Sequence, residues 1–301
     1  MPNASLKHYL HLHVLVVIAG FTAILGELIS IGSIKLVWYR MIIAGLLMGL
    51  YIFFRKINLK VKPKQLLLFF IAGVIIALHW ITFFEAINQS NVSLTLAMFS
   101  TGAFFAALIE PLFNKRHIKI YEIVFGLIVI IGVYLITSTE WHQSAGIILG
   151  LLSALLSSLF AIINGRFIKS HRASVISFYE FISGVLLLTV FIIFSDAGFN
   201  REFFLLPKTD WIYIFILASL CTTYAFIAVV NIMKYVSPYS VIISYNLEPV
   251  YGILLAILMF PEQEQMSIQF YLGTALIIAV VLLDGIYKNI RYRRTKALRK
   301  P

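Results

Sequence analysis

Ionisable side chains that stand deep inside long apolar stretches are the residues of this sequence best placed to do chemistry. Arg40 follows Tyr39 in one such stretch, and Glu180 follows Tyr179 in another. Glu248 lies in a third stretch. A charge at the centre of a bilayer costs about 2.5–3.5 kcal/mol on insertion scales, so it needs a partner or a water-filled space. These positions, with the tyrosines before them, are therefore candidates for binding a substrate or a coupling ion.

Arg40 has two interpretations that the sequence leaves open. It lies about six residues into its apolar stretch, which places it roughly 9 Å below the outer membrane surface. Arginine stays protonated in proteins, so the side chain must be paired or hydrated. One hypothesis is an anion site for the carboxylate or phosphate of a substrate. The other is a structural ion pair with Glu27, at the outer end of the preceding stretch.

The two buried glutamates are candidates for holding a cationic group or a proton. Burial favours the neutral form of a carboxyl group, so Glu180 can take up a coupling proton or bind a substrate amine, although a structural role is an equal alternative. Glu248 is followed by Pro249, which removes a backbone hydrogen bond and suggests a gate or a proton site. Tyr245 lies three residues earlier on the same helical face, and Asn246 flanks both.

Three further residues have both a functional and a structural interpretation. His79 is either a hydrogen-bonded structural residue or part of a proton relay, and Trp80 either stacks on an amphipathic substrate or fills space. Glu110 stands close to Lys115 and Arg116, which favours a local ion pair at the inner end of its helix.

The elements that position these residues are long apolar segments. The chain of 301 residues is 61% hydrophobic and 12% charged, with a mean hydropathy of +0.95, whereas soluble domains carry roughly 25% charged residues. A spanning helix needs about 20 apolar residues. Ten segments meet this requirement: 10–30, 34–54, 66–88, 92–113, 119–138, 145–167, 173–194, 210–233, 238–260 and 267–287.

Basic residues in the loops predict the orientation of these segments. With the N-terminus inside, the inner loops and tail hold most of the lysines and arginines, whereas the outer loops hold only Arg201 and Lys208. This is the positive-inside pattern of a multi-pass membrane protein. We therefore expect a plasma or inner-membrane protein with both termini in the cytoplasm, and the +11 net charge does not indicate a nucleic-acid partner.

The chain also has an internal repeat. Residues 126–135 resemble residues 273–282, and Phe178 to Glu180 falls where Trp38 to Arg40 does. Five helices are an odd number, so the second copy must enter the membrane upside down. The prediction is an all-α membrane protein of ten transmembrane helices, built as two inverted five-helix repeats over 1–140 and 141–301. Inverted repeats are typical of secondary transporters, which bind substrate near the midplane between the copies.

Several kinds of chemistry have no support in the sequence. It contains one cysteine and neither HExxH, a phosphate loop nor CxxC. No cofactor or metal is expected, and no enzyme activity. The open alternatives are an intramembrane enzyme acting on lipids, and a non-transporting sensor or assembly factor.

The sequence resembles the drug/metabolite transporter superfamily, specifically its EamA-like ten-helix group, over roughly residues 12–290. The matching motifs are Arg40 to Gly45, His79 to Ala86, Val236 to Pro238, Leu247 to Val250, and Pro261-Glu262. The resemblance implies a single-chain secondary transporter, often an exporter of amino acids or other metabolites, with helices five and ten at the periphery. The expected partners are a small-molecule substrate, the lipid bilayer, and a proton or counter-substrate. An importer or antiporter is the main alternative, and the assembly is a monomer or a homodimer.

Overall fold

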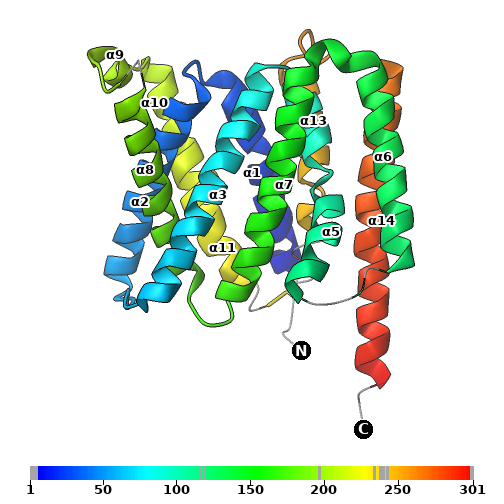
Figure 1. Cartoon of the computed structure of the whole chain (residues 1–301), viewed down its shortest axis with the longest axis horizontal. Helices are drawn as coiled ribbons and strands as arrows, with labels where there is room; N and C mark the ends of the chain where they lie inside the picture. Colours follow the sequence, from blue (N-terminus) through cyan, green and yellow to red (C-terminus); the bar gives the residue numbers. More distant parts are fainter. Residues whose placement is uncertain are drawn as a thin grey trace.

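The computed structural model describes residues 6–114, 117, 119–195, 198–232, 235–236, 241 and 244–298. These residues are organised as a bundle of helices (Figure 1). The principal helices are α1 (Leu6–Leu28), α2 (Ser33–Phe54), α3 (Pro63–Asn88), α4 (Val92–Phe99), α5 (Gly102–Asn114), α6 (Ile120–Glu140), α7 (Ser144–Phe167), α8 (Ala173–Phe194), α10 (Lys208–Ala218), α11 (Ala225–Ile232), α13 (Glu248–Met259) and α14 (Ile268–Leu298). Shorter elements are η1 (Trp141–Gln143), α9 (Arg201–Phe204) and the π-helix η2 (Ser219–Tyr224).

Eight stretches among the described residues are long and apolar enough to cross a membrane. One of them, Ile120–Phe167, contains both α6 and α7, and α13 adds a shorter apolar helix. A helix satisfies its backbone hydrogen bonds within the segment, which is why apolar stretches of this length fold as helices in lipid. The described helices thus agree with the predicted all-α, multi-pass architecture.

Three predicted segments are not continuous helices. Segment 92–113 is divided into α4 and α5, and segment 210–233 contains η2 between α10 and α11. Segment 238–260 includes residues outside the described part, and its helix α13 begins only at Glu248. Pro249 stands in the first turn of that helix, where no backbone N–H is needed, so the helix break expected beside Glu248 lies directly before it.

Polar side chains explain two of these interruptions. At the α4–α5 break, Ser100 Oγ donates to Ala97 O at 2.6 Å and Thr101 Oγ1 donates to Met98 O at 2.7 Å. In η2, Thr222 Oγ1 donates to Leu217 O at 2.8 Å. Hydroxyl groups that bond to nearby carbonyls compete with the regular helical pattern and support local bends.

The packing of the helices is reciprocal between the two halves. Helix α2 packs on α8 and α6 packs on α14, so the second and fifth helices of each half meet their own counterparts. Helix α3 packs on α7 as α11 packs on α1, and α4 packs on α7 as α13 packs on α1. Each of these contacts between the halves is therefore repeated by the equivalent helices when the two halves are exchanged, as an inverted repeat requires.

Helices α6 and α14 form one edge of the bundle, on the right of Figure 1. Glycines allow their close approach, because a Cβ added at Gly132 would lie 2.9 Å from Gly273 O. The peripheral position expected for helices five and ten is consistent with this arrangement.

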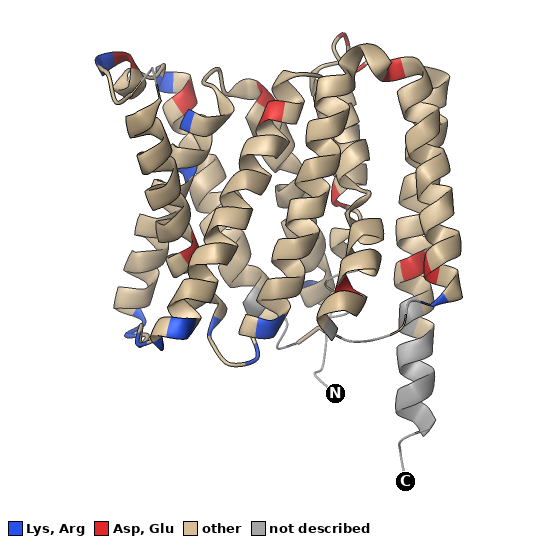
Figure 2. Ribbon diagram, in the orientation of Figure 1, with Lys and Arg blue, Asp and Glu red and all other residues tan. Residues whose placement is uncertain are grey.

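Charged residues divide the molecule into two ends. Most described lysines and arginines gather at the lower edge of Figure 2, where α1 begins and α14 ends. We call this edge the basic end, and the edge formed by α9 and the α6–α7 connection the opposite end.

Candidate functional site

Arg40 lies inside the bundle on α2, with 3% of its surface exposed. Its Nε donates to Thr222 Oγ1 at 3.0 Å, and its guanidinium carbon lies 3.8 Å from the centre of the Trp80 ring. Its Nη1 is buried and has no hydrogen-bond partner. A guanidinium has five donor hydrogens in a fixed fork, so an unsatisfied Nη1 is a donor available to an anion.

The alternative in which Arg40 forms an ion pair with Glu27 is wrong. Glu27 is exposed, and among the described residues no ion pair joins it to Arg40. Arg40 is instead held by α3 through Trp80 and by η2 through Thr222.

The π-helix η2 places Thr222 against Arg40. Thr222 Oγ1 donates to Leu217 O at 2.8 Å, so its lone pairs remain available to accept from Arg40 Nε. A π-helix is rare and often occurs at functional sites. Thr222 is a residue that the sequence analysis missed, because its link to Arg40 joins positions 182 apart along the chain.

The predicted group around Glu248 does surround a cavity. Tyr245, Asn246, Glu248 and Pro249 line a space of about 280 Å³ next to the α4–α5 break. Its other walls come from the break itself, from α7 and from α14, with Ser100, Ser157 and Ser158 among the lining residues. The cavity is thus formed by both halves of the chain, at the interruptions of segments 92–113 and 238–260.

Arg40 does not line the cavity that Glu248 lines. Among the described residues, no ion pair or hydrogen bond joins the Glu248 carboxyl group to another side chain. The bundle therefore holds a buried guanidinium with an unpartnered Nη1, and a glutamate without an ion-pair partner at the cavity.

The ring of His79 is held by Ser153 and Phe99. Its Nδ1 lies 2.9 Å from Ser153 Oγ and 3.1 Å from Ser153 O, and its ring stacks on Phe99 at 5.5 Å. The contact joins α3 to α7. Trp80, the next residue, faces Arg40 from the same helix.

Glu180 does not share a cavity with Glu248. It is 1% exposed, and its Oε1 accepts a hydrogen bond of 2.8 Å from Asn164 Nδ2 on α7. Tyr179 donates its hydroxyl to Leu59 O at 2.8 Å and so holds the loop between α2 and α3. These residues brace the basic end of the bundle.

Tyr39 belongs to a set of contacts that close the opposite end. Its hydroxyl donates to Phe203 O at 3.1 Å, and its ring packs on Phe203 and Trp211. Nearby, Lys35 Nζ donates to Glu202 O at 3.0 Å, and Ser30 Oγ donates to Asp210 Oδ2 at 2.7 Å. The first-half helices α1 and α2 are thereby tied to the second-half segment 202–211.

The aromatic side chains of segment 199–204 are part of this closure. Phe203 packs on Trp38 at 5.2 Å, while Phe204 is 52% exposed. The loop thus covers the ends of α2 and α10. For Glu110, the expected partners Lys115 and Arg116 lie outside the described residues.

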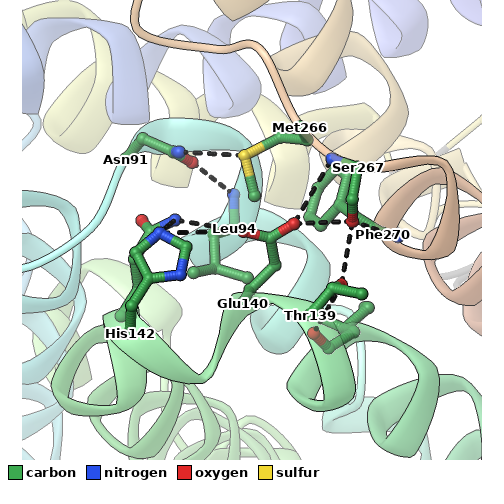
Figure 3. A network of polar contacts seen from close by, with 10 residues as sticks. Asn91, Leu94, Thr139, Glu140, His142, Met266, Ser267 and Phe270 are labelled. Atoms are coloured by element: carbon green, nitrogen blue, oxygen red, sulfur yellow. Dashed lines mark hydrogen bonds and ion pairs between the residues drawn. The ribbon is translucent and has the colours of Figure 1, made fainter.

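A further polar network joins the halves at the opposite end (Figure 3). Glu140 points toward Ser267, and its Oε1 accepts from Ser267 Oγ at 2.6 Å. Glu264 accepts from the backbone N–H groups of Val92 and Ser93 at 3.0 and 2.9 Å. Sequence reasoning missed both residues, since each carboxylate caps a helix of the other half and no local pattern marks such a contact.

The described residues contain no group of three or more His, Cys, Asp or Glu side chains that is arranged to hold a metal ion.

A model of the EamA-like transporter family matches the sequence twice, over residues 7–138 and 144–284. The chain belongs to the EamA-like transporter family. It is therefore a multi-pass membrane transporter of the drug/metabolite transporter superfamily. No curated protein matches this EamA-like transporter in sequence.

Solved structures share the fold of this transporter. One crystal structure, described only as that of a protein, superposes with a TM-score of 0.62 at 13% sequence identity. The match covers 92% of this chain and 96% of that chain. At this level of identity the likeness shows the common fold and does not indicate the substrate.

Proposed function

We propose that this EamA-like transporter is a secondary active carrier that moves a small amphipathic metabolite, such as an amino acid, by alternating access. In this proposal Arg40 binds the acidic group of the solute. Glu248 binds a cationic group or a coupling proton. The observation that carries the proposal is the buried Nη1 of Arg40, which has no partner.

The surroundings of Arg40 support an anion site over a purely structural role. A structural arginine at this depth requires a carboxylate partner, since burying an unpaired charge is costly. Arg40 has instead a neutral hydroxyl on Nε and an aromatic ring against its guanidinium. Both partners fix its direction without neutralising its charge, which leaves the charge available to a substrate.

Alternating access is supported by the different states of the two ends. The opposite end is closed by the contacts of Ser30, Lys35 and Tyr39 with segment 202–211. The basic end has a cavity of about 670 Å³ between the two halves. We therefore assign this arrangement to a conformation that opens toward the basic end, with residues 1–140 and 141–301 moving as the two repeats.

The orientation in the membrane is part of the same proposal. Positive loops remain in the cytoplasm, so we place the basic end and both termini on the cytoplasmic side of the inner membrane. Loading from that side favours export. An importer or antiporter of the same fold is the alternative, and counterflow in both directions distinguishes them.

The test is a thermal-shift screen of amino acids, carboxylates and amines on the purified protein, followed by proteoliposome counterflow with any compound that binds. Arg40→Ala is expected to abolish binding of an acidic compound, and Arg40→Lys to weaken it, because lysine lacks the planar fork. Glu248→Gln is expected to reduce counterflow. Matched controls are Arg201→Ala and Glu27→Gln, whose side chains are exposed.

Wild-type counterflow by both Arg40→Ala and Glu248→Gln would reject the assignment of the site. That result would leave the membership of the chain in the EamA-like transporter family unchanged. Normal elution and thermal unfolding of the variants without ligand separate loss of binding from loss of folding.

A further inference from the structure

The cavity at the basic end has chemistry of its own. It lies between the end of α2, the α7–α8 turn and α11, and it is separate from the space that Glu248 lines. Arg55 and Lys56 reach it from the first half, and His171 and Arg172 from the second. The cavity is therefore lined by basic residues of two loops that are distant in sequence.

The positive charge in this cavity is not neutralised by the protein. None of the described lining residues is acidic. Within the described part of the chain, the side chains of Arg55, Lys56 and Arg172 form no ion pair and no hydrogen bond. Loop charge alone accounts for basic residues at this end, but not for their convergence, because Lys60 and Lys169 of the same two loops lie outside the cavity lining.

The backbone at Lys56 is a second observation. Lys56 has a φ of +48°, in the left-handed region that favours glycine. Ile57 N donates to Ile52 O at 3.0 Å and Lys56 N donates to Phe53 O at 3.1 Å, so Lys56 occupies the residue after the helix end where glycine is usual. Lys56 thus adopts a backbone conformation that is strained for a residue other than glycine, and it lines the cavity.

The start of α8 adds donors to the same space. Ala173 and Ser174 line the cavity and form the first turn of α8, a helix of 22 residues whose N-cap, Arg172, makes no side-chain cap. Their N–H groups are among the orphan donors of a helix N-terminus, and the helix dipole favours an anion there. Together with the arginines, this set of donors matches the oxygens of a phosphate group.

The rim of the cavity is apolar and faces outward. Phe54 and Ile168 line it and are 75% and 45% exposed. In a membrane protein such side chains contact lipid. A ligand in this position can therefore carry its phosphate inside the cavity and an apolar tail along the rim.

We propose that this basic cavity binds the phosphate group of an anionic ligand, supplied by a phospholipid headgroup or by a soluble phosphate. The apolar rim favours the phospholipid. The ligand bridges α2 of the first half and α8 of the second half. This site is distinct from the substrate site proposed at Arg40. It lies in the cavity that the proposed function assigns to the open, basic end, and lipid binding tests it without a transport measurement.

The test uses the full chain in detergent and native mass spectrometry with phosphatidylglycerol, with phosphatidylcholine as the zwitterionic comparison and inorganic phosphate as the soluble arm. Wild type is expected to retain one more phosphatidylglycerol than the triple variant Arg55→Gln, Lys56→Gly, Arg172→Gln. The affinity of the variant is expected to fall on the order of 100-fold, since each lost cation contributes roughly a factor of five.

The matched control is Lys60→Gln with Lys169→Gln, which removes charge from the same loops outside the cavity. Unchanged phosphatidylglycerol retention in this control supports the site. Equal loss in the control and the triple variant shows general surface attraction and overturns it. Retention of phosphatidylcholine equal to phosphatidylglycerol also overturns it.

Binding of inorganic phosphate by the wild type, lost in the triple variant, supports the site with a soluble ligand. Thermal unfolding without added lipid checks that both variants fold.

Discussion

The guanidinium group of Arg40 lies 3.8 Å from the centre of the Trp80 ring, inside the bundle and without a carboxylate partner. The aromatic face attracts the cation, and Arg40 Nη1 has no hydrogen-bond partner. This stack joins α2 to α3 in the first half, while Thr222 contacts the same guanidinium from the second half. A movement of one half against the other therefore changes the environment of Arg40.

Replacement of Trp80 tests the stack. Trp80→Leu keeps much of the volume but removes the aromatic face, and Trp80→Phe keeps a smaller face. A cation–π contact contributes about 0.5–2 kcal/mol. We expect the leucine variant to weaken binding of an acidic compound by roughly 3- to 30-fold, and the phenylalanine variant to lose less. Dissociation constants from thermal-shift titration provide the measurement, and equal affinities of the two variants would contradict the prediction.

Thr222 and Thr223 form a matched pair in η2. Thr222→Val removes the acceptor of Arg40 Nε. Thr223→Val removes a hydroxyl that bonds to Ala218 O at 2.9 Å and to Ala44 O at 3.4 Å, but not to Arg40. A buried donor left without its partner costs about 1–3 kcal/mol. Thr222→Val is therefore expected to lower the unfolding midpoint and the affinity for acidic compounds. Thr223→Val should affect only the midpoint, and a loss of affinity in both would show that η2 acts through its shape alone.

Glu264 is expected to be needed for the start of α4. Its carboxylate accepts from Val92 N and Ser93 N and so satisfies two donors of the helix N-terminus. Glu264→Ala leaves both donors unpaired, which should destabilise the fold by about 1–3 kcal/mol. Glu262→Ala, an exposed neighbour in the same loop, serves as the control. Chemical denaturation in detergent measures both, and equal stability of the two variants would refute the capping role.

Tyr39 is expected to hold the opposite end closed. Tyr39→Phe keeps the ring contacts with Phe203 and Trp211 but removes the hydrogen bond to Phe203 O. A hydrogen bond of this kind contributes about 0.5–1.5 kcal/mol, so segment 199–204 should open more often. Hydrogen exchange of that segment should be faster by roughly 2- to 12-fold. Tyr213→Phe at the same end is the control, and an equal effect there would indicate general loosening.

Much of the fold was determined by the sequence itself. Ten apolar segments of spanning length, the basic loops and the paired patterns at 126–135 and 273–282 are local features, because a membrane forces each long apolar stretch to satisfy its own hydrogen bonds. The same logic identified Arg40 and Glu248, since ionisable groups at this depth stand out against their neighbours. The helix interruptions were less visible, because serine and threonine act there through single hydroxyl bonds.

Only the tertiary structure decided which residues meet. Glu27 is exposed on α1, whereas Arg40 is buried among α2, α3 and η2. Thr222, Glu264 and the basic cavity join positions that are more than a hundred residues apart. Such contacts depend on how helices cross, on the close approach of glycines, and on the direction of each side chain. None of these is encoded in a local pattern, so the partners of the buried charges became known only when the helices were packed together.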